Sequence, residues 1–242
     1  MTTVTIPSRM ADFDLTPEQQ AVRRAVREFA EREILPFVEE HETAERYPAT
    51  LIEKLIPLGY LTPIIPERYG GSETDVVTYG VICEELARVD WVVASVVSVT
   101  NSLVAGSIVR FGIDAQKEKW LPAICDGSVL TSACLTEPGG GSDLAGIQTR
   151  AGKTRGGWRL DGSKVFISHA AHAGVLLVAA TIDPAQRHRG VTVFLVDPTM
   201  AGVEIAEVPM RTLKRDNLAA VSYTHLRAHE TRHDLVCRLL LE

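Results

Sequence analysis

The sequence predicts an α+β protein in which an N-terminal all-helical domain is followed by a small antiparallel β-barrel or sandwich domain. In the first half of the chain apolar residues recur at helical spacing, and in the second half short apolar runs are separated by turn residues. The change falls near Gly127, and 242 residues suffice for one large domain or two smaller ones. We expect a helical domain over residues 1–127, a β domain over 128–220 and a distinct tail over 221–242.

The first helix carries a clear start signal. Thr16, Pro17 and Gln19 form a capping box with proline at the first helical position. Pro36 has no N–H to donate, so we expect it to bend or end this helix near Leu35. Further helices are predicted over residues 49–58, 75–87, 92–111 and 115–125, the first of them ended by Gly59.

The stretch over residues 91–109 has no charged side chain and is close to the length of a membrane span. It nevertheless contains six Ser, Thr and Asn residues, which are costly when they face lipid. We therefore interpret it as a buried core helix and expect no association with a membrane.

The β domain is predicted from apolar runs of strand length. Asp161-Gly162 separates the first two runs and is a type I′ hairpin signal. The runs cover residues 158–160, 165–167, 175–181, 191–196 and 203–208. Short strands at this spacing are typical of a small barrel or sandwich.

Composition excludes several classes of function. The net charge of −6 leaves no basic excess, so we do not expect a nucleic-acid partner. The four cysteines, at positions 83, 125, 134 and 237, form no C-x-x-C pair and are expected to be free thiols. The first ten residues lack the features of a signal peptide, and a cytoplasmic location is the expectation.

Residues 135–143 are the most informative stretch of the chain. They read Leu-Thr-Glu-Pro-Gly-Gly-Gly-Ser-Asp. Three glycines after a proline turn can direct successive backbone N–H groups into one concavity, which suits a phosphate or pyrophosphate. The spacing differs from the dinucleotide fingerprint G-x-G-x-x-G, and no G-K-[ST] follows as in a P-loop.

Three motifs in order resemble the acyl-CoA dehydrogenases. They are residues 135–143 with Thr149 and Ala151, the strand Gly-Ser-Lys-Val-Phe-Ile-Ser at 162–168, and residues 111–122, which run from Phe-Gly to Leu-Pro. The resemblance covers roughly residues 12 to 210. It implies an α-β-α subunit plan, relative to which a chain of this length lacks the third, helical domain.

The resemblance also implies the residues of a flavin site. FAD is expected to contact seven residues: Leu135, Thr136, Gly141, Ser142, Phe166, Ile167 and Ser168. Ser98 and Leu103, together with Ser142, are expected to contact the substrate. His169 and His172 replace a commoner Asn-rich stretch, and we interpret them as loop residues rather than catalysts.

The reaction implied by the resemblance is α,β-dehydrogenation of an acyl-CoA thioester with hydride transfer to FAD. The family's catalytic glutamate belongs to the third domain, so we name no catalytic residue and expect this chain alone to be inactive. An electron-transfer flavoprotein or similar acceptor and a homotetramer are the implied partners. Two alternatives remain: a flavin oxidase or monooxygenase of the same superfamily, and a non-catalytic module that binds acyl-CoA or flavin.

The composition changes abruptly from Val221, and residues 221–242 hold three of the seven histidines. We interpret this tail as non-native. His225, His229 and His233 would align on one face of a helix, a spacing used by some zinc sites. No Glu stands at the H-E-x-x-H position, and no metal site is predicted.

Overall fold

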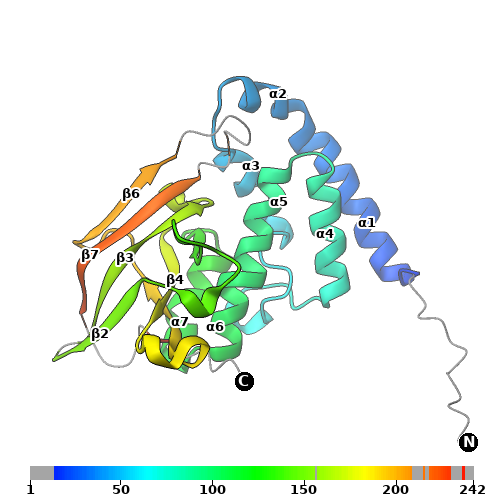
Figure 1. The fold of residues 1–242 in the computed structure, drawn as a ribbon. Helices are drawn as coiled ribbons and strands as arrows, with labels where there is room; N and C mark the ends of the chain where they lie inside the picture. Colours follow the sequence, from blue (N-terminus) through cyan, green and yellow to red (C-terminus); the bar gives the residue numbers. More distant parts are fainter. Residues whose placement is uncertain (1–13, 156, 209–214, 216–217, 230–235, 238–242) are drawn as a thin grey trace, which may run out of the picture.

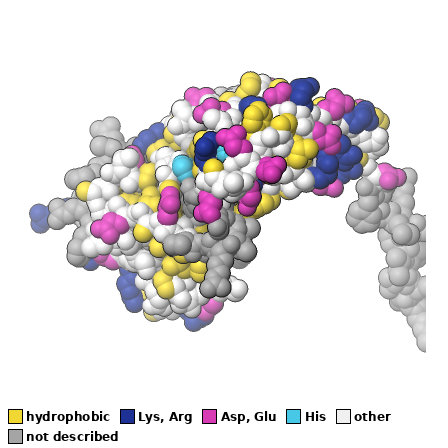
Figure 2. Space-filling view, turned by 90° about the horizontal axis from the view of Figure 1, so that it is seen from above, with side chains coloured by type: hydrophobic (Ala, Val, Ile, Leu, Met, Phe, Trp, Pro, Cys, Tyr) yellow, Lys and Arg dark blue, Asp and Glu magenta, His cyan; other side chains and the backbone are white. Residues whose placement is uncertain are grey.

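The computed structural model describes residues 14–155, 157–208, 215, 218–229 and 236–237. Helices from the first half of the chain pack against one side of a curled sheet formed by the second half (Figure 1). This is the predicted α+β arrangement. On the face seen in Figure 2, acidic and basic side chains are interspersed over the helices.

The helical part consists of seven α-helices and several shorter turns among the described residues. The α-helices are α1 (Pro17–Phe29), α2 (Leu35–Thr43), α3 (Ala49–Glu53), α4 (Val76–Ala87), α5 (Trp91–Ser98), α6 (Gly106–Phe111) and α7 (Asp114–Cys125). Two π-helical segments, η1 (Ala30–Ile34) and η4 (Val99–Ala105), interrupt longer helices. Single 3-10 turns are η2 (Ile56–Leu58) and η3 (Glu67–Tyr69), and between the strands η5 (Leu144–Gly146) and η6 (Ala170–His172); η7 (Pro184–Gly190) is a longer 3-10 segment with a kink at Arg187.

The predicted signals of the first two helical stretches are confirmed, with one change. The Thr16 hydroxyl accepts from the Gln19 N–H, and the Gln19 amide accepts from the Thr16 N–H. The helix break expected before Pro36 is the π-helical segment η1, which ends at Ile34, directly before α2 begins at Leu35. The helix expected over residues 49–58 is divided into α3 and η2, and Gly59 ends it at a φ of 70°.

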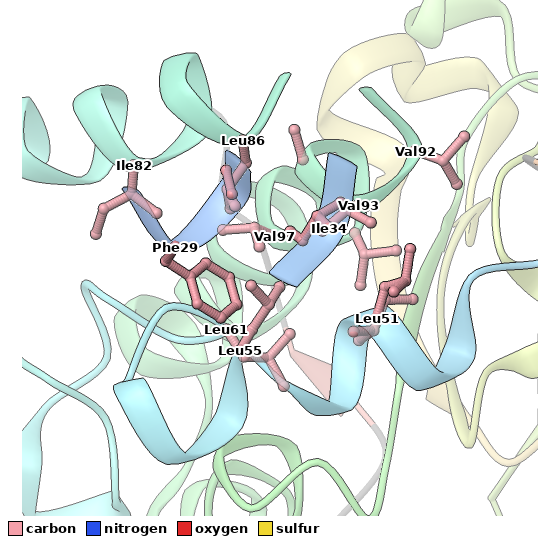
Figure 3. Close-up of a cluster of buried hydrophobic side chains, with 14 of the residues drawn as sticks. Phe29, Ile34, Leu51, Leu55, Leu61, Ile82, Leu86, Val92, Val93 and Val97 are labelled. Carbon is pink, nitrogen blue, oxygen red and sulfur yellow. The ribbon is translucent and has the colours of Figure 1, made fainter. Parts of the chain in front are cut away.

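The helical core lies between α1, α3, α4 and α5. Figure 3 shows its apolar side chains meeting from all four helices and from the segment that follows η2. The labelled residues are Phe29, Ile34, Leu51, Leu55, Leu61, Ile82, Leu86, Val92, Val93 and Val97. On the surface of this core, Glu85 of α4 is buried and accepts ion pairs from Arg27 of α1 and Arg88. These contacts fix α1 against α4.

The helical stretch Trp91–Phe111 is long and apolar enough to cross a membrane by length and composition. Just over half of its most apolar window is buried inside the structure. Its first turns contribute to the helical core, and Val104 and Ile108 pack in a second apolar cluster against the sheet. This is the packing of a core helix.

The sheet contains eight strands in the described part of the chain. They are β1 (Thr131–Cys134), β2 (Arg150–Thr154), β3 (Gly157–Ile167), β4 (Val175–Thr181), β5 (Val191–Val196), β6 (Val203–Glu207), β7 (Ala219–His229) and β8 (Val236–Cys237). Their order is β6-β7-β3-β2-β4-β5-β8, with β1 beside β4. Most neighbours are antiparallel, but β1 runs parallel to β4.

Strand β4 is buried on both faces. Val175, Leu177 and Ala179 pack towards the helices. Leu176 and Val178 pack into the other apolar cluster, which is enclosed by β3, β5 and β7. This double burial explains the continuous apolar sequence of β4, and it places β1 and β4 between the helices and the rest of the sheet.

The hairpin predicted at Asp161-Gly162 is wrong. Residues 157–167 form one continuous strand, β3, and the register with β7 shifts between Leu160 and Gly162. A Cβ at Gly162 would lie 2.7 Å from the Thr149 Cα atom, and its φ is 152°. Glycine therefore permits a bulge and a close approach rather than a turn.

The tail predicted from Val221 begins inside a strand. Val221 and Tyr223 of β7 are buried between β3 and β6, so the described start of this segment belongs to the sheet. The helical alignment considered for the histidines is wrong, because His225 and His229 lie in β7. His233 lies outside the described residues. The non-native origin of the tail stays a prediction.

Candidate functional site

The glycine-rich loop leaves β1 and closes at once into a tight turn. The Glu137 N–H donates to the Gly140 carbonyl, and the Gly140 N–H donates to the Glu137 carbonyl, both at 3.0 Å. Residues 138–143, which include the tip of this turn and the loop after it, are exposed. A Cβ at Gly139 or Gly140 would meet no protein atom within 4 Å. Packing within the chain therefore leaves open space beside these two residues.

A buried ion pair anchors this turn to β3. The Lys164 ammonium lies 2.9 Å from Glu137 Oε1 and also donates to the Leu135 carbonyl at 3.2 Å. The Lys164 side chain is fully buried, and Glu137 is 7% exposed. Both oxygens of the Glu137 carboxylate accept further hydrogen bonds, Oε1 from the N–H and the hydroxyl of Thr149 and Oε2 from the N–H of Gln148.

The electrostatics of this pair reflect burial and hydrogen bonding together. Burial raises the pKa of the Glu137 carboxyl, but hydrogen bonds from Thr149, Gln148 and Lys164 outweigh it, so the net pKa lies below the ordinary value. Burial lowers the pKa of the Lys164 ammonium, and Glu137 opposes that shift only in part. The sequence motifs contained both residues, but only the fold shows that they form one contact.

The end of β3 carries Phe166 and Ile167, and Ser168 follows it directly; these are the three residues assigned to the other edge of the flavin. The Val165 N–H donates to the Thr136 carbonyl at 3.0 Å, and the Ser132 hydroxyl donates to the Ser168 carbonyl at 2.6 Å. These bonds hold the end of β3 beside β1 and its loop. The structure therefore brings together Leu135 and Thr136 with the strand end.

Phe166 stands out within that strand end. Its side chain is 57% exposed although Ile167 beside it is buried, and its φ of 57° is unusual for an aromatic residue. Backbone strain of this kind costs about 1–3 kcal/mol and persists at functional sites. The strained backbone accompanies a Phe166 ring that is exposed at the end of β3.

Gly141 and Ser142 lie in the exposed part of that loop. A Cβ at Gly141 would lie 3.2 Å from the Thr136 Cγ2 atom, so Gly141 lets the loop pass close to Thr136. The side chain of Ser142 is exposed. Gly141 and Ser142 thus continue the exposed loop beyond Gly139 and Gly140.

The residues assigned to the substrate lie on the helical side. Ser98 ends α5, and Leu103 lies in η4 and is 39% exposed. Within η4 the Thr100 hydroxyl contacts the Thr131 hydroxyl of β1 at 3.0 Å. The helix that carries Ser98 and Leu103 is thereby attached to the strand that leads into Leu135.

Asn101 supports the π-helical segment. Its side-chain amide donates to the Val97 and Leu61 carbonyls at 2.7 and 2.8 Å, and Asn101 is fully buried. A π-helical turn leaves backbone groups without their usual helical partners, and such turns are frequent at functional sites. Asn101 thus bonds the Val97 carbonyl of α5 and ties η4 to the segment at Leu61.

His169 makes a second contact between the helices and the sheet. It is fully buried, and its Nε2 lies 2.9 Å from the Ser95 hydroxyl of α5. Burial, with a smaller contribution from His172, lowers the pKa of His169 to about 4. His172 stacks on the Tyr47 ring at 3.9 Å. His169 is therefore a buried contact residue, which its position in a loop sequence did not indicate.

The described residues contain no group of three or more His, Cys, Asp or Glu side chains placed to hold a metal. Cys83, Cys125 and Cys134 are free thiols, as predicted, and the side chain of Cys237 lies outside what the structure describes. Burial raises the pKa of Cys83 to about 11 and that of Cys134 to about 12. These thiols are therefore poor nucleophiles.

Known proteins match this chain over both of its parts. The model of the acyl-CoA dehydrogenase N-terminal domain matches residues 16–128, and the model of the acyl-CoA dehydrogenase middle domain matches residues 132–224. The fold and the paired loop and strand end define a protein of this class. The chain belongs to the acyl-CoA dehydrogenase family.

Individual relatives agree with this assignment. An acyl-CoA dehydrogenase of Bacillus subtilis is 35% identical over 193 residues, which are 80% of this chain and 51% of the relative. A short-chain specific acyl-CoA dehydrogenase of Megasphaera elsdenii is 38% identical over 195 residues, 79% of this chain and 51% of the relative. The chain therefore spans about half the length of these curated relatives.

Two solved structures share the fold at similar identity. The butyryl-CoA dehydrogenase of Megasphaera elsdenii superimposes with a TM-score of 0.85 at 32% identity, over 93% of this chain and 60% of the other. A glutaryl-CoA dehydrogenase from Mycobacterium smegmatis in complex with FADH2 gives a TM-score of 0.85 at 30% identity, over 93% and 56% of the two chains.

Proposed function

We propose that this chain is the N-terminal and middle portion of an FAD-dependent acyl-CoA dehydrogenase that oxidises the α,β bond of an acyl-CoA thioester. The observation that carries the proposal is the Lys164–Glu137 ion pair. It joins the glycine-rich loop to the strand end with Phe166, which are the two segments that the family resemblance assigns to the flavin.

The residues present fit a flavin. Phe166 presents an exposed aromatic ring, and such a ring suits packing against a flat heterocycle. The exposed loop suits a pyrophosphate, because no protein atom lies within 4 Å of a Cβ built at Gly139 or Gly140, and a ligand could approach the backbone closely there. When bound, FAD supplies the hydride acceptor.

The chain's own residues bind and orient. Ser168 and Thr136 place hydroxyl groups at the two segments, where donors can stabilise developing negative charge. Ser98 and Leu103 on the facing helix would contact the acyl group, with Ser142 at the outer end of the substrate. Buried Val104 lies in the apolar cluster between the helices and the sheet, which excludes water from that packing.

We assign removal of the α-proton to none of the described residues. Glu137 is the carboxylate of the glycine-rich loop, but its oxygens already accept hydrogen bonds from Lys164, Thr149 and Gln148. A general base must reach the proton that it removes, and Glu137 is buried against β3. We therefore propose that the 242-residue chain binds FAD without turning over substrate.

FAD titration of the chain, followed by flavin fluorescence, tests the cofactor assignment. Phe166→Ala is expected to weaken FAD binding roughly tenfold because a ring contact is lost. Phe37→Ala is the matched control, since Phe37 is a similarly exposed ring in α2, outside this site. Absence of FAD binding, or equal affinity for both variants, would contradict the assignment.

Anaerobic addition of butyryl-CoA to the FAD-loaded chain tests the chemistry. We expect no bleaching of the flavin absorbance by the 242-residue chain. Bleaching would place the base within this chain and overturn that part of the proposal. After chemical reduction, slow reoxidation in air supports a dehydrogenase, whereas rapid reoxidation favours the oxidase alternative.

The partners of the whole enzyme follow from its class. We propose an acyl-CoA substrate, an electron-transfer flavoprotein as acceptor, a homotetrameric assembly and a cytoplasmic location. One solved neighbour, 31% identical, is described with the electron transferring flavoprotein of Acidaminococcus fermentans, which supports an acceptor of that type.

A further inference from the structure

A cavity of about 480 Å³ opens beside the sheet. Its walls come from β2, β3, the end of β4 and the start of η7. None of the residues assigned to FAD or to the substrate lines it. Cavities of a few hundred Å³ are of the size that holds a small organic ligand.

Two arginines converge on this cavity from neighbouring strands. Arg150 of β2 pairs with Asp161 of β3, and Arg159 pairs with Gly152, so both guanidinium groups leave the same face of the sheet. Arg159 Nε donates to Asp161 Oδ2 at 2.8 Å, which orients its guanidinium group. Arg150 forms no ion pair or side-chain hydrogen bond with any residue in the described part of the chain.

A buried hydroxyl completes the wall between the arginines and η7. Thr181 is only 3% exposed, and its Oγ1 atom has no hydrogen-bond partner among the described residues. Its backbone N–H donates to the Thr149 carbonyl, so the hydroxyl is the Thr181 donor that remains for a ligand in the cavity. A buried polar atom without a partner is costly, which indicates that something else in the cavity bonds to it.

The charge balance selects the ligand. Two guanidinium groups face one carboxylate, Asp161, so the cavity has an excess of positive charge. Arginine forks match the oxygens of a phosphate group in two-point hydrogen bonds, and a Thr hydroxyl can donate a further one. Ile182 and Pro184 at the rim offer apolar surface to the remainder of the molecule.

We propose that this cavity binds a phosphate-bearing small molecule, with Arg150 and Arg159 on the phosphate and the Thr181 hydroxyl as a further donor. The site is distinct from the flavin loop but shares a wall with its support. The N–H of Gln148, a residue of the cavity wall, donates to Glu137, and Gly162 packs against Thr149.

Calorimetric titration of the 242-residue chain with inorganic phosphate and with ADP tests the site. Arg150→Gln is expected to weaken binding at least about tenfold, since a charged hydrogen-bond donor is lost. Arg24→Gln on the exposed surface of α1 is the matched control and should bind as the parent does. Tighter binding of ADP than of phosphate would identify a nucleotide, and equal binding would identify the phosphate group alone; both support the site.

Thr181→Val separates binding from folding. Valine keeps the shape and removes a hydroxyl that has no protein partner, so thermal stability should not fall while ligand affinity falls severalfold. FAD affinity should be unchanged in both cavity variants, which distinguishes failure here from failure of the flavin assignment. Undetectable binding of both ligands at millimolar concentration, or parental affinity in Arg150→Gln and Thr181→Val, would overturn the proposal.

Discussion

Replacing Glu137 by Gln should destabilise the protein strongly, although the side chain keeps its size. Glu137 and Lys164 are 7% and 0% exposed, and their charged atoms lie 2.9 Å apart. The substitution leaves the Lys164 ammonium buried without an anionic partner and with only neutral carbonyl acceptors such as that of Leu135. Removing one partner of a buried pair costs about 3–5 kcal/mol.

The hydrogen-bond pattern adds to this cost. Glu137 Oε1 accepts from Lys164 and Thr149, while Oε2 accepts from the Gln148 N–H at 2.6 Å. If the amide oxygen takes the first position, the amide NH2 group points at the Gln148 N–H, and two donors face each other. The free energy of unfolding, measured by urea denaturation at pH 7, should therefore fall by about 3–5 kcal/mol.

A double-mutant cycle identifies the cause. Lys164→Met removes the cation, and the Glu137 carboxylate keeps its bonds from Thr149 and Gln148. The variant with both substitutions should lose less than the sum of the single variants, because neither charge is then left unpaired. A loss below about 1 kcal/mol in Glu137→Gln, or strict additivity, would refute the reasoning.

Three further predictions use the same denaturation assay. Thr16→Ala should cost about 1 kcal/mol, because the capping box of α1 is lost, and an unchanged midpoint would contradict this. The pKa of His169 is lowered from 6.5 to about 4, so the unfolded chain binds more protons than the folded chain between these two pH values. The free energy of unfolding should therefore fall by about 3 kcal/mol as pH falls through that window. His169→Gln should flatten this dependence on pH. Arg215→Met should cost about 3–5 kcal/mol, because the fully buried Asp90 loses its 2.8 Å contact to the guanidinium group, and a loss below about 1 kcal/mol would show that the Asp90 carboxylate finds another partner.

Local signals predicted the helical half of the fold well. The capping box, the Gly59 stop and the break before Pro36 act within one turn of chain, and their effect does not depend on tertiary contacts. Strands β4 and β5 were predicted at their observed bounds because their apolar runs are long. Strands β1 and β2 were missed because they are short, and β2 is largely exposed.

The error at Asp161-Gly162 has a specific physical cause. The dipeptide favours a two-residue turn when the flanking strands can pair with each other. Here the strand on each side pairs instead with β2 and β7, and the glycine accommodates the approach of Thr149. Long-range strand pairing therefore outweighs the local preference for a turn, and this pairing cannot be read from a single sequence.

The site was predictable as a set of motifs but not as a geometry. The loop after β1 and the end of β3 are separated by some thirty residues, and their contact depends on Lys164 reaching Glu137 through the core. The sequence places His169 where the family resemblance has an Asn-rich stretch and predicts a loop residue, yet the fold buries it against Ser95. Such contacts depend on the packing of two domains.

Polar contacts across the helix–sheet boundary hold the two halves of the chain in one arrangement. Thr100 of η4 contacts Thr131 of β1, and Ser95 of α5 contacts His169 just after β3. Each contact joins the helix that carries the acyl-group residues to one of the two segments assigned to the flavin. Apolar packing alone is non-directional and would tolerate sliding between helix and strand. Buried hydrogen bonds do not tolerate it, because a displaced donor or acceptor would be left unpaired. The register between the two sets of residues is therefore set by these polar pairs, whereas the surrounding apolar clusters supply most of the stability.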